Sequence, residues 1–191
     1  MLNWFRRKPD STIVSLYGAI VARARHPFFY AELGVPDTVE GRFDMIVLHL
    51  ALAIRRLREG GPDERRLIQP LFDHFCLDLD HNLREMGVSD LGVPRRMRKF
   101  GEAFYGRAAA YDRALDAGDE RELAAALSRN VFATPDTPEP KAAARLAAYV
   151  KHCAEALARQ PPSAWLAGKI RFAEPPEATA RGAAPVQGDL P

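Results

Sequence analysis

The chain has 191 residues, of which 47% are hydrophobic, and a formal net charge of +2. A chain of this length corresponds to about one domain and can bury a sizeable core. The net charge is too small for a protein that binds nucleic acid by bulk charge, so a basic function would have to come from local clustering.

The cysteines and the apolar segments limit the compartment. Cys76 and Cys153 are far apart in no metal or redox spacing, so we expect buried free thiols in a reducing environment. No stretch approaches the roughly 18 consecutive apolar residues of a membrane span. We therefore expect a cytoplasmic protein. Trp4 and Phe5, beside the cations at 6–8, either touch an anionic membrane or form a frayed terminus.

Helical periodicity runs through most of the chain, and no strand or hairpin signal interrupts it. Asp10 or Ser11 is expected to cap the first helix, and Asp37 to open a capping box with Glu40. Pro70 is expected to mark a kink or a boundary. The spacing of apolar residues predicts helices over residues 11–25, 39–59, 63–86, 93–117, 120–130 and 141–159, an aromatic connector at 28–36, a Pro-rich loop at 134–140 and one further turn at 163–169 in which Trp165 and Leu166 pack back.

We therefore predict an all-α fold, a single-domain bundle of about six to seven helices. Residues 1–10 are expected to be a flexible N-terminus and residues 11–172 the helical domain. Residues 173–191 are rich in Ala, Pro, Gly and charge, a composition that cannot build a core, and are expected to be a disordered tail.

Residues 70–107 are the stretch around which the rest is organised. Apolar residues recur every four positions up to Leu83, which predicts an acidic amphipathic helix with one buried stripe. Gly87 is placed to adopt the left-handed conformation that ends such a helix. A 3-and-4 spacing then predicts a long second helix with one buried face, made by Val93, Met97, Phe100, Phe104, Ala108, Tyr111 and Leu115.

Cations crowd the first turns of the second helix, at Arg95, Arg96, Arg98 and Lys99. Cations at a helix N-terminus oppose the helix dipole and cost a few tenths of a kcal/mol each. Either they pair with acids of the preceding helix, or an acidic partner docks there. Contact with RNA phosphates is a third hypothesis. Aromatic residues that stack on bases should lie between the cations, but Phe100 and Phe104 lie on the buried stripe.

The sequence gives only weak signals for a catalytic site or a metal site. His74, Asp78 and His81 project from one helical face and could hold zinc or iron, but no second cluster supplies a fourth ligand, and a solvated surface looks the same. His49 lies beside an apolar stripe and is expected to be a core residue. The carboxylates that could act as general acids or bases lack a nearby nucleophile or Gly-rich loop; they are Asp73, Asp80 and Glu85.

Two groups of residues resemble the ubiquinol–cytochrome c chaperone family. The run over residues 83–107, LREMGVSDLGVPRRMRKFGEAFYGR, followed by Ala110-Tyr111, is similar to the family's most distinctive part. The earlier group consists of Phe29-Tyr30, Leu33-Gly34-Val35-Pro36-Asp37-Thr38, Gly41-Arg42-Phe43-Asp44 and His49. The similarity covers roughly residues 15–160, and the combination is specific although each piece alone is weak.

The resemblance implies a non-enzymatic, all-helical assembly chaperone for the respiratory cytochrome bc complex, without a cofactor. It implies cytochrome b or its nascent chain as client, near the ribosomal exit. Peripheral contact at the inner membrane is a separate expectation, through the N-terminus. A small partner protein is known for mitochondrial relatives. The alternatives are a ribosome- or membrane-surface scaffold that uses Arg95–Lys99, or a metal- or haem-handling protein. The residues expected to bind the partner are Asp80, Arg84, Met86, Gly87, Asp90, Met97, Arg98, Lys99, Tyr105 and Arg107, with Val88 and Leu91 as further apolar ground.

Overall fold

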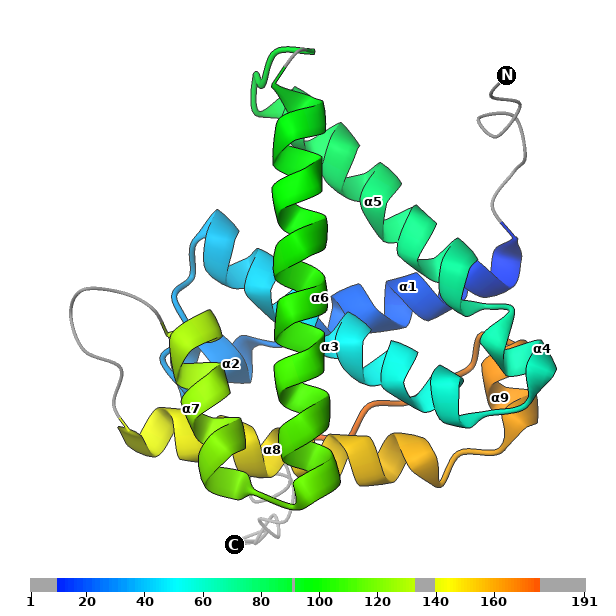
Figure 1. Cartoon of the computed structure of the whole chain (residues 1–191), viewed down its shortest axis with the longest axis vertical. Coiled ribbons are helices and arrows are strands. Elements are labelled where there is room, and N and C mark those ends of the chain that lie inside the picture. Colours follow the sequence, from blue (N-terminus) through cyan, green and yellow to red (C-terminus); the bar gives the residue numbers. More distant parts are fainter. Residues whose placement is uncertain (1–9, 91, 133–139, 176–191) are drawn as a thin grey trace, which may run out of the picture.

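The computed structural model describes residues 10–90, 92–132 and 140–175, and these residues form helices with no strand among them. The predicted all-α fold class is confirmed (Figure 1). Six of the helices in these ranges have 12 or more residues and the other three have five or fewer. They are α1 (Ser11–Ala24), α2 (Pro27–Ala31), α3 (Val39–Glu59), α4 (Pro62–Arg65), α5 (Ile68–Glu85), α6 (Val93–Ala117), α7 (Glu120–Val131), α8 (Pro140–Ala158) and α9 (Pro162–Leu166).

Helix α3 is the centre of the fold, so the expectation that the chain is organised around residues 70–107 is wrong. Twelve of its 21 residues are buried, on all sides of the helix, because α1, α5, α6, α7 and α8 all pack against it. Its start is set by Thr38, whose Oγ1 accepts a hydrogen bond from the Gly41 N–H at 3.1 Å. The expected cap, Asp37, is wrong by one residue, since its carboxylate binds Arg42 at 2.7 Å instead.

Helix α2 replaces part of the expected connector. The His26 side chain accepts a hydrogen bond from the Phe28 N–H at 3.3 Å, and Pro27 occupies the first helical position, where its missing N–H costs nothing. Phe28 and Phe29 are buried. The aromatic residues therefore belong to the core, and they enter it from a short helix rather than from a loop.

The helix expected over residues 63–86 is two helices, α4 and α5. Glu64 is buried, accepts a hydrogen bond from the Gly61 N–H at 2.9 Å and pairs with Arg56 at 2.8 Å. These contacts hold α4 as a separate turn and place the break at Arg66–Leu67. Pro70 neither kinks nor bounds α5, because it falls in the first turn, where backbone N–H groups lack a partner within the helix.

The last segments close the bundle behind α3. Gly118 has a φ of +64°, Asp119 caps α7, and α7 packs against α8. Trp165 is fully buried as expected, whereas Leu166 is 41% exposed, so its expected packing is wrong. Residues 167–175 return past the core as a strap, in which Phe172 and Ala173 are buried.

His49 is a core residue, as its position predicted. Its Nδ1 lies 2.7 Å from the Met45 carbonyl oxygen and its Nε2 lies 2.9 Å from the Tyr149 hydroxyl. Burial lowers the pKa of His49 to about 4, so the ring is neutral at physiological pH. The histidine joins α3 to α8 through a polar contact that is satisfied inside the core.

Several predictions lie outside the described residues. They concern the N-terminal aromatic and basic residues at 1–9, Leu91, most of the Pro-rich loop, at 133–139, and the tail from 176 onward.

Candidate functional site

The helices α5 and α6 form a hairpin that rises above the other helices (Figure 1). Its connection begins with Gly87, which has a φ of +80°. The Gly87 N–H donates to the Arg84 carbonyl at 2.9 Å, and the Val88 N–H donates to the Leu83 carbonyl at 3.0 Å. This pair of bonds is a Schellman motif, so the predicted role of Gly87 at the helix end is confirmed.

The inner sides of the hairpin form one apolar seam. The α5 stripe from Leu71 to Leu83 is buried, and all seven residues of the predicted α6 stripe are buried or half-buried. Phe100 lies against Phe43 of α3, with ring centroids 4.7 Å apart. Met97 is half-buried, whereas Met86 and Tyr105 are 55% and 64% exposed. The structure thus leaves two large apolar side chains of the predicted site open to solvent.

Arg84 binds two acidic residues near the tip of the hairpin. Its Nε donates to Asp80 at 2.7 Å and its Nη1 donates to Asp90 across the turn. These hydrogen bonds raise the pKa of Arg84 above its ordinary value. The three side chains are exposed or half-exposed, so they form a surface ionic cluster that bridges α5 and the turn.

The cations of α6 do not pair with the acids of α5. Arg98 reaches only Glu102 on its own helix, at 4.0 Å, and both side chains are more than two-thirds exposed. Arg95, Arg96 and Lys99 are exposed and have no ion pair within the part of the chain that the structure describes. Pairing with the preceding helix therefore does not account for these four residues.

Arg107 lies apart from the other predicted site residues. It donates to Asp44 of α3, and the two side chains are 23% and 17% exposed. Burial raises the pKa of Asp44, although the contact with Arg107 opposes that shift. The pair anchors α6 on α3.

The suspected metal ligands have separate partners. Asp78 accepts a hydrogen bond from the Tyr17 hydroxyl at 2.8 Å, His74 packs edge-on against the Tyr17 ring, and His81 lies 3.1 Å from Glu85. Among the described residues, no group of three or more His, Cys, Asp or Glu side chains is placed to hold a metal ion.

The acids considered for proton transfer are engaged on the helix surface. Asp73 accepts a hydrogen bond from Gln69 at 2.7 Å, and Asp80 binds Arg84. Glu85 faces His81. Each contact joins neighbouring turns of α5, an arrangement that stabilises a helix rather than one that lines a cleft.

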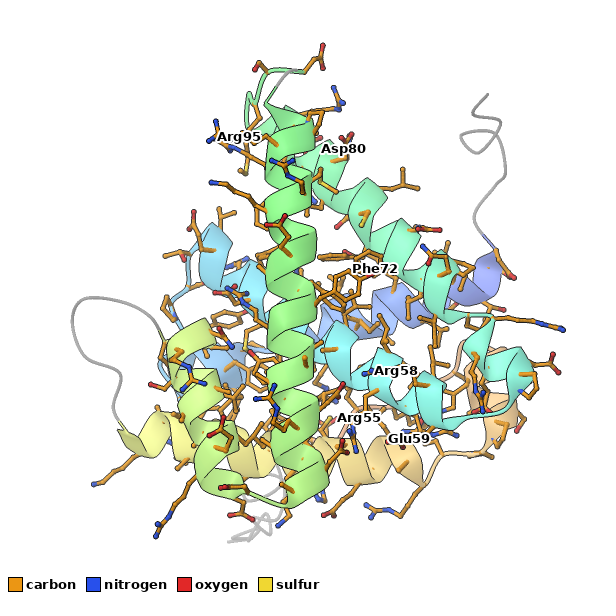
Figure 2. All side chains as sticks on the ribbon, viewed as in Figure 1. Arg55, Arg58, Glu59, Phe72, Asp80 and Arg95 are labelled. Carbon is orange, nitrogen blue, oxygen red and sulfur yellow. The ribbon has the colours of Figure 1, made fainter. Side chains whose placement is uncertain are left out.

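A groove lies where α5 and α6 diverge, with α3 as its floor. Its volume is about 930 Å³. Figure 2 shows Phe72 of α5 at the narrow end of this opening, between α5 and α6. Arg55 and Arg58 of α3 lie below it in the same view. The Phe72 and Tyr105 ring centroids are 5.7 Å apart. The lining residues are Ile54, Arg58, Ile68, Phe104, Tyr105, Ala108, Ala109, Asp112, Arg113, Asp116 and Ala117.

The rim of the groove is charged and largely self-paired. Arg58 donates to Asp112, and Arg55 lies 2.7 Å from Asp116. Arg113 is exposed and has no ion pair with a described residue. The groove thus has an apolar floor of aliphatic and aromatic side chains inside a polar edge, the usual anatomy of a protein-binding surface.

Of the residues predicted from the sequence to bind a partner, only Tyr105 lines this groove. The sequence does carry a signal for the other groove residues of α6. It is a second stripe on this helix, at Tyr105, Ala109, Asp112 and Asp116, which also follows a 3-and-4 spacing.

In the part of the chain that the structure describes, no helix is both long and apolar enough to cross a bilayer.

The chain is similar to a known family and to proteins of known name. The sequence model of the ubiquinol-cytochrome C chaperone family matches residues 31–172. The ubiquinol-cytochrome-c reductase complex assembly factor 1 of Xenopus laevis is 26% identical over 150 residues, which are 78% of this chain and 74% of that protein. The protein of the same name in Mus musculus is 23% identical over 150 residues, 78% of this chain and 50% of that protein.

The fold is also found in a solved structure. The crystal structure of the Cbp3 homolog from Brucella abortus superposes with a TM-score of 0.79 at 43% sequence identity, and the match covers 87% of this chain and 91% of that one. The family model spans well over half of the chain and includes the α5–α6 hairpin and its groove. The chain therefore belongs to the ubiquinol-cytochrome C chaperone family, whose members are chaperones for assembly of ubiquinol–cytochrome c reductase.

Proposed function

We propose that the protein is a non-enzymatic assembly chaperone that binds cytochrome b or its nascent chain through the α5–α6 hairpin, residues 70–107, at the groove that begins at Tyr105 and continues along α6. The observation that carries the proposal is the groove itself, an opening of about 930 Å³ with an apolar floor and a charged rim. A chaperone for a membrane protein must hold apolar segments reversibly, and a patch of this kind suits that task.

The dimensions of the groove indicate what it could hold. Along α6 it runs from Tyr105 to Ala117, a helical rise of about 18 Å, or roughly three turns. Ala108 and Ala109 in its wall let another backbone approach closely. An apolar helical segment of the client fits such a groove lengthwise, with its polar ends beside Arg113 and the rim acids.

Occlusion of the groove tests the proposal. Ala109→Arg places a long charged side chain in the groove, and Ala109 is exposed, so the fold should tolerate it. Ala125→Arg on α7 is the matched control, because Ala125 is also an exposed helical alanine but lies outside the groove. Recovery of cytochrome b with the tagged protein from detergent-treated membranes should fall only in Ala109→Arg. Equal recovery with both variants would remove the groove from the mechanism.

A second candidate function is a helical scaffold on a ribosome or membrane surface. The observation that favours it is the set of cations without ion pairs, Arg95, Arg96 and Lys99. Salt separates the two candidates. Binding to phosphates weakens steeply as salt rises, whereas binding in an apolar-floored groove weakens little.

A further inference from the structure

Positive charge is concentrated at the tip of the hairpin. Residues 84–99 contain five cations and two acids, a net charge of +3. Since the whole chain carries +2, the remainder carries −1. Arg84 and Arg98 pair with Asp80 and Glu102, which flank this stretch, so the cations left without an ion pair to a described residue are Arg95, Arg96 and Lys99.

The cations at this end share an outward direction. At about 100° per residue, Arg95, Arg96 and Lys99 fall within roughly 100° of arc, nearly opposite the half-buried Met97. Figure 2 shows Arg95 on the side of α6 away from Phe72. Arg98 is different, because it points along the groove side of α6 and meets Glu102 at 4.0 Å.

Stability does not explain these three residues. They lie in the first turns of α6, where the helix dipole disfavours cations, and they have no ion pair with a described residue. The same dipole adds to the positive potential that an external anion would meet. Cations kept against the dipole and without partners are suited to a negatively charged surface outside the molecule.

The surroundings of the cations favour lipid over RNA. The tip extends beyond the other helices, so it can approach a flat surface before the body does (Figure 1). Met86, at the tip, is 55% exposed and supplies an apolar side chain next to the charge. Among the residues that the structure describes, no aromatic side chain stands between the cations to stack on bases, since the neighbouring Phe100 packs on Phe43.

We propose that the hairpin tip, through Arg95, Arg96, Lys99 and Met86, docks on an anionic phospholipid surface. This inference rests on the second candidate function and names its partner. Lys99 and Tyr105 are six residues apart, about 9 Å along the helix, so docking would set the mouth of the groove close to the lipid headgroups. A client segment that leaves the bilayer, or is about to enter it, would then meet the groove directly.

Vesicle sedimentation of the full chain without any client tests the proposal. The probes are phosphatidylcholine vesicles, either pure or containing one part in three of phosphatidylglycerol. Binding should require phosphatidylglycerol and weaken with salt. Each cation near an anionic surface is worth about fivefold in partitioning, so the triple variant Arg95→Gln/Arg96→Gln/Lys99→Gln should lose about a hundredfold. Met86→Ser should lower partitioning onto the vesicles by a few-fold.

The matched control removes the same charge elsewhere. Arg121, Arg129 and Lys141 are exposed cations on α7 and α8, and their triple replacement by Gln should leave partitioning within a few-fold of the wild type. Equal loss in both triple variants, or equal binding to neutral vesicles, would overturn the proposal. So would a single-stranded RNA oligonucleotide that binds the tip in preference to the vesicles, although the scaffold function would survive that result.

The same tip variant separates this proposal from client binding. In detergent extracts, where no bilayer remains, Arg95→Gln/Arg96→Gln/Lys99→Gln should recover as much cytochrome b as the wild type, whereas Ala109→Arg should not. A loss of recovery in the tip variant under these conditions would assign the three cations to the client instead of the membrane.

Discussion

Arg107 of α6 donates a hydrogen bond to Asp44 of α3, and this contact ties the long helix of the hairpin to the central helix of the fold. The two side chains are mostly buried, at 23% and 17% exposure. Both residues belong to segments whose sequence resembles the family, and the structure brings them together from 63 positions apart.

Loss of the Arg107 guanidinium should destabilise the protein. Arg107→Ala leaves the Asp44 carboxylate without its partner in a half-buried site, which we expect to cost about 2 kcal/mol of the free energy of unfolding. The double variant Arg107→Ala/Asp44→Asn should recover part of that loss. Urea unfolding of the single and double variants gives the coupling energy, and strictly additive effects would contradict the assigned pairing.

The turn glycine gives a second prediction. Gly87 has a φ of +80°, a region that β-branched residues rarely occupy, so Gly87→Val should lower stability by about 1–2 kcal/mol. Gly101 is the control, because it lies inside α6 and a Cβ added there would meet no other side chain within 4 Å. Gly101→Ala should raise stability by about 0.5–1 kcal/mol. An unchanged midpoint in Gly87→Val would refute the role of Gly87 at the helix end.

The core histidine predicts how stability depends on pH. The unfolded chain binds a proton at His49 below about pH 6.5, whereas the folded protein, in which burial lowers the pKa of His49 to about 4, does not. The unfolded state therefore binds more protons between these values, and stability should fall by about 3 kcal/mol as the pH drops from 6.5 to 4. Chemical unfolding measured at several pH values in this range should show that the free energy of unfolding depends less steeply on pH in His49→Gln than in the wild type.

The exposed tyrosine of the groove separates binding from folding. Tyr105 is 64% exposed and contacts Phe72 and Phe104 at the narrow end of the groove. Tyr105→Ala should therefore cost less than about 1 kcal/mol of stability while lowering recovery of the client. Val39→Ala is the control, because Val39 is 61% exposed at the start of α3 and is not part of the groove. If both variants recover the client equally well, Tyr105 is not a contact.

The main helices were predictable because their signals are local. Asp10 caps α1, Gly87 ends α5 and Gly118 ends α6, each at the position that its residue type favours. The division between α4 and α5 was not predictable in this way. It depends on the contact between Glu64 and Arg56, and that contact exists only after α3 and α4 have packed.

The candidate site was predicted in part. Met86 and the α6 cations are exposed, which agrees with a surface role. Arg107 was predicted to belong with them but instead pairs with Asp44 of α3. Helical periodicity carries no information about such a partner on another helix. The groove was missed for a similar reason. It arises from the angle at which α5 and α6 separate over α3, a property of the packed helices rather than of either helix.

The strap at residues 167–175 has a consequence for biosynthesis. Arg23 of α1 donates to Glu174 at 2.9 Å and to the Phe172 carbonyl oxygen at 3.4 Å, so the first helix is held by nearly the last described residues. A ribosome makes the N-terminal helix first, and its final neighbour appears only some 150 residues later. The contact between α1 and the strap can therefore form only after the intervening helices, α2 to α9, have been synthesised, although α1 can pack on α3 and α5 before then.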